Sequence, residues 1–498
     1  MYIIPLDIQK NTRGHQILSG EIQKSFGPIR AKGNRKNSLR YLKNFKEFYY
    51  ICIRTEHKDM IESPPKIRKE QFDKALRLSC DPTIADIVNK INKQYLYWTD
   101  VKYKHLPDKI SAQDLWACVK LSRMFSKTLE IGNYRFKLYV TDSMQQLCHE
   151  FDMNLGGYLG TQSFIPDADK NRYLISSNME EAIASSQMEG AATTRKIAKD
   201  MLRRSVSPRT RGEQMIHNNY ETIRFILQHK DEKFTKETLL HIHQLMTYKT
   251  LEDSNDEGRF RTDNNVVVED GITHETIHTP PDSSEIEGLI ESICKFFGDD
   301  DFNDVFIHPI IKGVIIHFLI AFIHPFVDGN GRTARAVFYW YMLRKGYWLT
   351  EYLSISRIIS RSKRQYEKAY LYTECDEYDL GYFVAYHLQA VGLAYNELRQ
   401  YIQRKIDEQQ QTSDFLRLGN VNARQAQIIK WYNDSPSLSF SVKEIQTRMN
   451  VSYPTAKGDL EGLAKLGYID IIPVNKVKNT YIRSEKFKEL TEQTLKFL

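Results

Sequence analysis

The stretch that decides the fold is HPFVDGNGRTAR, which occupies residues 324–335. It follows a run from Ile310 to Phe322 that is apolar on nearly every face, and this pattern predicts a helix buried inside a domain. Pro325 is expected to end that helix, because the residue before a proline is pushed out of the helical region. A second helix is expected to begin near Gly331, so the two glycines of the stretch fall in a turn where the backbone can approach a ligand closely.

The residues around this turn have the chemistry of a polyphosphate site. A helix N-terminus favours an anion, and Arg332 and Arg335 stand three positions apart, so both can lie on one side of the first turn. Asp328 offers a hard oxygen ligand for Mg²⁺, and His324 titrates near neutral pH, so it can take a proton from an attacking hydroxyl group. A lone His-Pro or Gly-Asn-Gly sequence is more often a turn than a site, but here all these residue types coincide within twelve positions.

The stretch resembles the signature of the Fic family, His-Pro-Phe-x-(Asp/Glu)-Gly-Asn-(Gly/Lys)-Arg-x-x-Arg, at every specified position. The resemblance implies a largely helical enzyme that transfers AMP from ATP to a hydroxyl side chain of a protein. It implies that His324 is the general base, that Asp328 holds Mg²⁺ and that Tyr366 lies near the adenine, although aromatic residues at helical spacing are usually packing residues. The residues implied to bind the phosphates are Gly329, Asn330, Gly331, Arg332 and Arg335.

A second motif occupies residues 185–190. On its own, it would be interpreted as a packed helix with a solvent-facing Glu189. Beside the intact signature, Ser185, Glu189 and Gly190 match the inhibitory motif of the Fic family, (Ser/Thr)-x-x-x-Glu-(Gly/Asn), in the N-terminal arrangement called class II. The resemblance implies that Glu189 pairs bidentately with Arg335 where the γ-phosphate of ATP would otherwise bind, so the unmodified chain is expected to be weakly active.

Two β-prone runs, 265–268 and 275–279, are separated by Glu269-Asp270-Gly271, and the Asp-Gly pair favours a tight hairpin turn. In the Fic family this hairpin is the flap beside the active site, where a target segment docks by strand addition; a plain surface hairpin is the alternative. The resemblance places the target-docking residues at Val266, Val267, Val268, Thr276 and Ile277.

Four other histidines are not interpreted as catalytic or metal-binding residues. His274 and His278 are expected at the surface, because no helical His-x-x-x-His pair or nearby acidic partner predicts a zinc site. His308 and His317 flank or lie within the predicted buried helix and are expected to be hydrogen-bonded core residues.

The composition of the 498 residues, 41% apolar and 27% charged, is typical of a soluble globular protein with two to four domains. No apolar run reaches the roughly 18 residues that span a bilayer, the start shows no signal peptide, and six scattered cysteines indicate reduced thiols; these features predict a cytoplasmic protein without a membrane partner. The net charge of +7 is concentrated in residues 1–50, which hold ten Lys or Arg and three Asp or Glu. This predicts a local basic face, and a solvated charged surface explains it better than general nucleic-acid binding.

The expected fold class is mainly α, with a Fic-type helical bundle core, a small β-hairpin flap and a winged helix-turn-helix domain. We expect an unassigned basic segment at 1–82 with a strand at 48–53, an N-terminal helical region at 83–170, the Fic core at 171–400 and the winged helix domain at 416–498. Within the core, Ser177 and Glu180 have the spacing of a capping box, which predicts that the inhibitory helix covers about 177–190.

The winged helix prediction rests on a helix with an apolar face and on two β-prone runs around a basic tip at Lys476 and Lys478. A helix end and polar linker are expected at 407–414, before this domain. The expected recognition helix holds Asp459 and Glu461, which weaken the attraction to phosphate, so DNA binding and protein docking both stay open.

The function that follows is an autoinhibited, Mg²⁺-dependent protein adenylyltransferase that uses ATP to modify a Ser, Thr or Tyr hydroxyl, on another protein or on the chain itself. Two alternatives stay open: an enzyme that removes AMP or works in both directions, and a DNA-binding regulator in which the Fic core only senses nucleotide. An intact His324 favours an enzyme, because a sensor needs phosphate ligands but no base. A homo-oligomer is also compatible with the sequence.

Overall fold

The computed structural model describes residues 61–107, 110–156, 170–269, 276–298, 306–416, 420–475 and 478–495. The strand expected at 48–53, most of the basic N-terminal segment, the turn at Asp270-Gly271, His274 and Lys476 lie outside the described residues. The contacts divide the chain into two compact units, Met1–Tyr395 and Asn396–Leu498, and each is described by itself. The described residues are mostly helical with small β-hairpins, which confirms the expected fold class.

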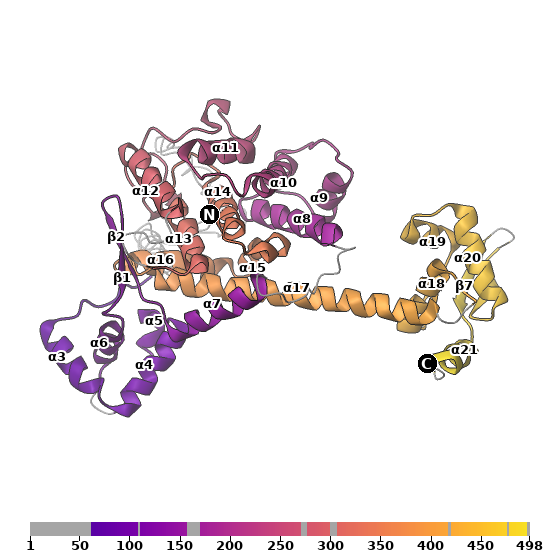
Figure 1. Ribbon diagram of the computed structural model, residues 1–498, viewed down its shortest axis with the longest axis horizontal. Coiled ribbons are helices and arrows are strands. Elements are labelled where there is room, and N and C mark those ends of the chain that lie inside the picture. Colours follow the sequence, from indigo (N-terminus) through magenta and orange to yellow (C-terminus); the bar gives the residue numbers. More distant parts are fainter. Residues whose placement is uncertain are drawn as a thin grey trace, which may run out of the picture. The chain divides into compact units, whose positions relative to one another are not determined.

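The centre of the first unit is a pair of packed helices, α13 (Pro309–Ile323) and α14 (Asn330–Arg344). Nearly every residue of both helices is buried, so the all-round apolar pattern before residue 324 correctly predicted an interior helix. Figure 1 shows this pair enclosed by neighbouring helices. These neighbours are α8 (Lys170–Met188), α10 (Arg211–His229), α11 (Lys236–Thr247), α12 (Ile286–Gly298) and α15 (Ile355–Arg361).

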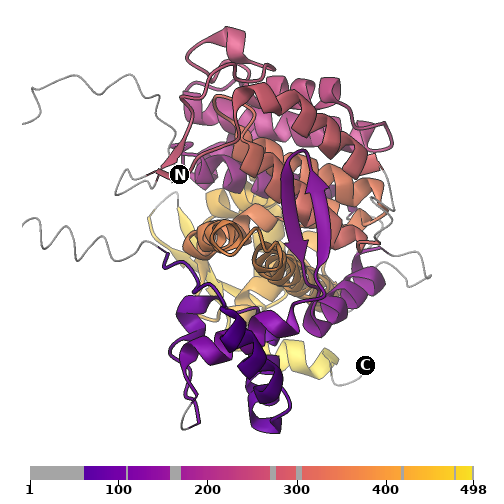
Figure 2. The same cartoon turned by 90° about the vertical axis from the view of Figure 1, so that its left-hand side faces the viewer.

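The N-terminal region is less uniformly helical than its sequence pattern suggests. Its described helices are α3 (Lys69–Leu78), α4 (Pro82–Gln94), α5 (Trp98–Val101), α6 (Ala112–Ser122) and α7 (Asp142–Leu155). Between α6 and α7 lies an antiparallel hairpin of β1 (Lys127–Ile131) and β2 (Tyr134–Leu138), which stands out in Figure 2. Alternate residues of both strands are buried, so the burial pattern here repeats every two residues, as in a strand, and not with the spacing of a helix.

Helix α8 begins at Lys170, so the expectation of a helix start at Ser177 is wrong. Nothing in the six residues before Ser177 stops a helix, and the capping-box spacing there lies inside a helix that has already begun. Glu180 instead forms ion pairs with Arg195 and Lys199 of the following segment.

A small apolar cluster joins the C-terminal half of α8 to α9 (Arg195–Arg203) and α10. Met179 and Ile183 of α8 pack there with Met201 of α9 and with Met215 and Ile216 of α10. This packing fixes the end of α8, and with it Glu189, against the first half of α10.

The expected flap is present as a short antiparallel hairpin of β3 (Val268–Glu269) and β4 (Thr276–His278). Val268 pairs with His278, and Glu269 pairs with Thr276. The side chains of residues 266–268 are buried, whereas Thr276 is exposed.

The remaining elements of the first unit follow the central pair or flank the flap. They are η4 (Ser254–Asp256), η5 (Ser283–Glu285), η7 (Trp348–Tyr352) and α16 (Lys363–Cys375). The next helix, α17 (Gly381–Leu416), runs through the polar residues 407–414, so the expectation of a linker there is wrong. Its Glu and Gln residues are good helix formers, and no glycine or proline interrupts them.

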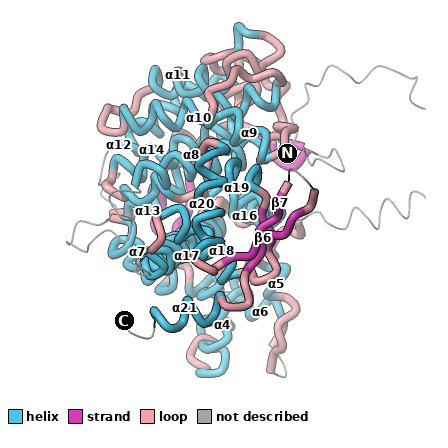
Figure 3. The backbone as a smooth tube through the Cα atoms, turned by 90° about the vertical axis from the view of Figure 1, so that its right-hand side faces the viewer, coloured by secondary structure: helices cyan, strands magenta, loops and turns pink. Residues whose placement is uncertain are grey.

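The second unit has its own apolar core, to which Ile429, Tyr432, Leu460 and Tyr481 belong. Its sheet has the antiparallel order β5-β7-β6, and Figure 3 shows β6 beside β7. The assignment as a winged helix domain stays a prediction. The elements are α18 (Ala423–Asp434), β5 (Ser439–Phe440), α19 (Val442–Met449), α20 (Tyr453–Lys465), β6 (Ile469–Pro473), β7 (Asn479–Arg483) and α21 (Phe487–Leu495).

Across the described residues of both units, every helix is too short or too polar to cross a lipid bilayer.

Candidate active site

A cleft in the first unit gathers most of the residues that the sequence singled out. Its wall is formed by the end of α13, the start of α14, the flap, α16 and the residue after α8. The sequence separates these segments by up to almost two hundred positions, so only the fold brings them together. The lining includes Glu189, Val268, His278, His324, Asp328, Gly329, Asn330, Gly331, Arg335 and Tyr366.

His324 lies in this cleft as a neutral base. It follows the last turn of α13 in a left-handed conformation (φ 49°), and its Nδ1 lies 3.1 Å from the carbonyl oxygen of Ala321. A carbonyl only accepts, so Nδ1 carries the hydrogen and Nε2 carries the lone pair. Nε2 is buried and has no hydrogen-bond partner among the described residues. Burial, followed by the nearby His278, lowers the pKa of His324 to about 4, so the imidazole can accept a proton at neutral pH.

Arg261 holds the peptide around His324 in place. Its backbone N–H donates to the carbonyl oxygen of Pro325, and its Nε donates to that of His324, both at 2.9 Å. The two terminal nitrogens donate to the carbonyl oxygens of Asp263 and Pro281, which stand on opposite sides of the flap. One buried guanidinium group therefore ties the base to both stems of the flap.

His243 supports the next part of the turn. Its Nε2 donates to the carbonyl oxygen of Asp328 at 2.8 Å, and its Nδ1 accepts the N–H of Gly258 at 3.0 Å. Its ring stacks on Phe326 with a centroid distance of 3.7 Å. Burial lowers the pKa of His243 to about 4, which suits a ring that donates once and accepts once. This role was not predictable from the sequence, because a histidine within a helix, outside any motif, is usually interpreted as a packing or surface residue.

The turn that contains the two glycines is stabilised by contacts of its own residues. Gly329 has φ 86° and precedes α14, and a Cβ there would come within 2.8 Å of Thr247. The side chain of Asn330 accepts the N–H of Phe326 at 2.9 Å and donates to its carbonyl oxygen at 2.7 Å. Since both ends of the Asn330 amide serve the turn, its contribution to an anion site would come from its backbone N–H, which has no partner inside the helix.

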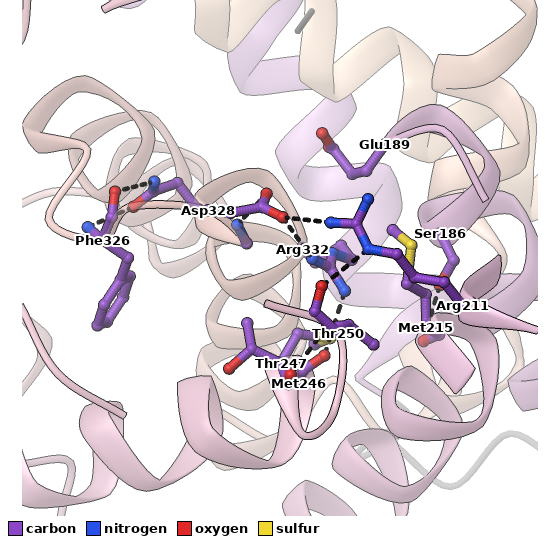
Figure 4. Close-up of polar contacts among 12 residues, drawn as sticks. Ser186, Glu189, Arg211, Met215, Met246, Thr247, Thr250, Phe326, Asp328 and Arg332 are labelled. Carbon is purple, nitrogen blue, oxygen red and sulfur yellow. Dashed lines mark hydrogen bonds and ion pairs between the residues drawn. The ribbon is translucent and has the colours of Figure 1, made fainter. Parts of the chain in front are cut away.

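Arg332 is a buried guanidinium group with unused donors. One terminal nitrogen donates to the carbonyl oxygen of Met246 at 3.1 Å, as Figure 4 shows. Its Nε and its other terminal nitrogen have no hydrogen-bond partner among the described residues, and burial lowers its pKa. A buried cation with unsatisfied donors fits an anionic group such as a phosphate.

Arg335 is held by the segment that ends α8. Its Nε donates to Ser185 Oγ at 2.9 Å, and one terminal nitrogen donates to the Ser185 carbonyl oxygen at 3.0 Å and to Glu189 Oε1 at 2.9 Å. The pairing with Glu189 uses a single carboxylate oxygen rather than the bidentate geometry that we expected. Gly331 leaves the room for it, because a Cβ at this position would collide with Glu189.

Glu189 is ionised in this position. Burial raises the pKa of its carboxyl group, but the attraction and hydrogen bond of Arg335 outweigh burial and leave the pKa lowered. Gly190, which follows it, has φ 89° and ends the helix in a left-handed conformation.

Asp328 is a partly exposed carboxylate between two arginines. Its Oδ2 lies 3.5 Å from Arg211 and 3.7 Å from Arg332, and about a third of its side chain, 34%, is exposed. Among the described residues, no group of three or more His, Cys, Asp or Glu side chains converges. A Mg²⁺ ion would therefore take one oxygen from Asp328 and its other ligands from phosphates and water, which is the usual coordination of this ion with nucleotides.

Two further residues line the cleft on the side of α16. The hydroxyl group of Tyr366 lies 3.0 Å from His317 Nε2 and 3.3 Å from Tyr370, so the expectation of a hydrogen-bonded core histidine at 317 agrees with the structure. His278 is buried, and the expectation of a surface residue there is wrong. It bonds the Phe322 carbonyl oxygen at 2.8 Å and Glu374 at 3.0 Å, and so it fastens β4 to the helices beneath.

Residues 233–342 match the family model described as Fic/DOC family. This stretch of the chain is similar to the Fic/DOC family. Two curated relatives are both named protein adenylyltransferase Fic: the protein of Drosophila mojavensis is 33% identical over 70 residues, and that of Drosophila grimshawi is 31% identical over 70 residues. In both cases the match covers 14% of this chain, and it spans about a seventh of the length of the relative.

Solved structures of Fic proteins give weaker matches over longer stretches. Fic-1 of C. elegans is 15% identical with a TM-score of 0.46, and the match covers 80% of this chain and 99% of that chain. A Fic family protein of Desulfovibrio desulfuricans G20 is 20% identical with a TM-score of 0.45, and covers 70% of this chain and 98% of that one.

The matched Fic/DOC residues include α11, the flap, α12, α13 and nearly all of α14. His324, Asp328 and the two arginines of α14 therefore lie inside the matched stretch. Glu189, Arg211, Tyr366 and the second unit lie outside the matched residues, and their roles are argued from geometry alone.

Proposed function

We propose that this chain is a Fic-type protein adenylyltransferase that transfers AMP from ATP to a Ser, Thr or Tyr hydroxyl group of a protein. The observation that supports this most is the lone pair of His324 Nε2, which is buried at a cleft that also holds the start of α14. A base and an anion site in one cleft suit the attack of an alcohol on a phosphate. The names of the relatives agree with this chemistry.

In the proposed reaction, the target hydroxyl gives its proton to His324 Nε2 while its oxygen attacks the α-phosphorus of ATP. The bond from that phosphorus to the bridging oxygen breaks, and pyrophosphate leaves. The first N–H groups of α14 and the unused donors of Arg332 stabilise the charge on the phosphates. Bound Mg²⁺ would neutralise further phosphate charge, with Asp328 as its protein ligand.

We further propose that Glu189 inhibits the transfer. Arg335 is the arginine expected to take the γ-phosphate, and its terminal nitrogen is already paired with Glu189 at 2.9 Å. Ser185 bonds the same guanidinium group twice, which fixes the orientation in which it meets the carboxylate. ATP would have to bind with its γ-phosphate elsewhere, and a shift of its α-phosphate away from His324 would slow the reaction.

The target segment is proposed to dock at the flap by backbone pairing. The buried side chains of residues 266–268 leave the backbone of the hairpin as the part that a target strand can meet. Such pairing tolerates many target sequences, so the hairpin does not identify the target.

The test is label transfer from ATP that carries the label on either the α- or the γ-phosphate. The proposal predicts protein-bound label from the α-position and none from the γ-position. Label from the γ-position would indicate a kinase-like reaction, and binding of ATP without any label transfer would support the nucleotide sensor instead.

A further inference from the structure

Arg211, the first residue of α10, contacts Asp328, which lines the cleft, although Arg211 belongs to neither motif. Its Nε donates to the carbonyl oxygen of Thr250 at 2.8 Å, and a terminal nitrogen lies 3.5 Å from Asp328 Oδ2. Figure 4 shows its guanidinium group between these two partners. The side chain is 63% exposed, in contrast to the buried Arg332 and Arg335.

Several contacts hold the backbone at the start of α10, so the exposed guanidinium group of Arg211 extends from a fixed part of the chain. Thr210 caps the helix by accepting the N–H of Glu213 at 3.2 Å. A Cβ added to Gly212 would come within 2.8 Å of the backbone nitrogen of Ala192, which shows how closely the helix meets the segment after Glu189. The same helix accepts a hydrogen bond from Ser186 Oγ at the Met215 carbonyl oxygen.

Among the described residues, Asp328 is the only carboxylate that forms an ion pair with Arg211. Its Oδ2 lies 3.5 Å from Arg211 and 3.7 Å from Arg332. Both distances exceed the roughly 2.7–2.9 Å of a charge-assisted hydrogen bond. Around the start of α14, the described side chains thus combine three guanidinium groups with two carboxylates, Asp328 and Glu189.

We propose that Arg211 is a third phosphate-binding arginine, which contacts the β- or γ-phosphate of a bound nucleoside triphosphate. The inference rests on the proposed function, because it takes ATP as the ligand of the cleft. A cation on Asp328 would remove the carboxylate that Arg211 now faces, and the guanidinium group would then find its anion on the phosphate chain. This role explains why an exposed arginine is held at Nε by Thr250 while a terminal nitrogen faces Asp328 at 3.5 Å.

The test is nucleotide binding to the full chain in the presence of Mg²⁺, measured by titration calorimetry with ATP, ADP and AMP. For Arg211→Ala we expect ATP affinity to fall about tenfold and AMP affinity to change less than about twofold, because AMP lacks the outer phosphates. Arg211→Lys keeps the charge and should recover part of the ATP affinity. Arg209→Ala is the matched control, since it removes an exposed arginine two positions away and should leave all three affinities unchanged.

Equal loss of ATP and AMP affinity in Arg211→Ala, or no loss of either, would overturn the inference. An equal loss with a lower melting temperature would assign Arg211 a structural role through Thr250. If ATP bound neither to the wild-type chain nor to Glu189→Gly, the proposed function would fail and the inference with it. If Arg211→Ala lost affinity for ATP but not for AMP, and the wild-type chain and Glu189→Gly transferred no label, Arg211 would still be a phosphate-binding residue. Only the proposed transfer reaction would then be contradicted.

Discussion

At the scale of single residues, the protonation state of His324 decides whether the cleft can do chemistry. The Ala321 carbonyl oxygen assigns the hydrogen to Nδ1, and burial keeps the ring neutral. The lone pair of Nε2 is therefore present without any rearrangement at neutral pH. Because the pKa is lowered in the folded protein, the neutral form is lost only as the pH falls towards 4.

This gives a pH prediction for the Glu189→Gly variant. Its transfer rate with ATP should stay within about twofold between pH 7.5 and 5.5 and should fall only as the pH approaches the His324 pKa of about 4. A rate profile over this range is the measurement. A rate that halves near the ordinary histidine pKa of about 6.5 would show that the base is not buried as described.

Glu189 gives the second prediction at this scale. Replacing it by glycine frees a terminal nitrogen of Arg335 for the γ-phosphate and should raise the rate of label transfer at least about tenfold, since a hydrogen bond between charged groups is worth roughly 1.5–3 kcal/mol. Glu189→Gln keeps the shape but loses the charge, so it should give a smaller increase. Equal rates for wild type and Glu189→Gly under matched conditions would remove the inhibitory role.

At the scale of elements, the flap and the glycine turn form one braced assembly. Arg261 bonds the backbone on both sides of the flap and on both sides of the His324–Pro325 peptide bond. His278 fastens β4 to the last turn of α13 and to α16. The hairpin and His324 are thus held in a fixed relation by two side chains.

Arg261→Ala tests this bracing. We expect it to lower the unfolding free energy by about 3 kcal/mol, because several buried carbonyl oxygens lose their donor. The transfer rate should fall about tenfold or more while ATP affinity changes little, since the proposed phosphate-binding residues are on α14. Thermal unfolding and separate measurements of KM and kcat check both effects. A variant with weaker ATP binding and an unchanged kcat would contradict the assignment.

The elements also show which features of the structure can be predicted from the sequence and which cannot. The turn at 324–335 was predictable, because a proline and two glycines impose its geometry locally. Arg261 and His243 were missed, because their partners lie 63 and 85 positions away in the chain. The early start of α8 was missed for a related reason: a capping-box spacing marks a helix start only when the preceding residues cannot continue the helix.

At the scale of the whole molecule, the unit that holds the cleft and the C-terminal unit have separate hydrophobic cores. The cleft is built from residues of the first unit, and the second unit packs around its own buried cluster, which includes Leu460. Leu460→Ala should therefore destabilise the second unit by about 2–5 kcal/mol through the cavity it leaves. Transfer activity should stay within about twofold of the parent chain, and calorimetric melting with a labelling assay tests this. Loss of transfer at temperatures where the second unit has unfolded but the first unit is still folded would contradict the separation.

The measurement that tests the central claim most directly compares Glu189→Gly with the double variant that also carries His324→Ala. Both proteins keep the start of α14, Arg332 and Arg335, so both should bind ATP with similar affinity. Only the variant with His324 should transfer label from the α-phosphate of ATP to protein. Equal labelling by both proteins would contradict the account, because the imidazole would then not be the base.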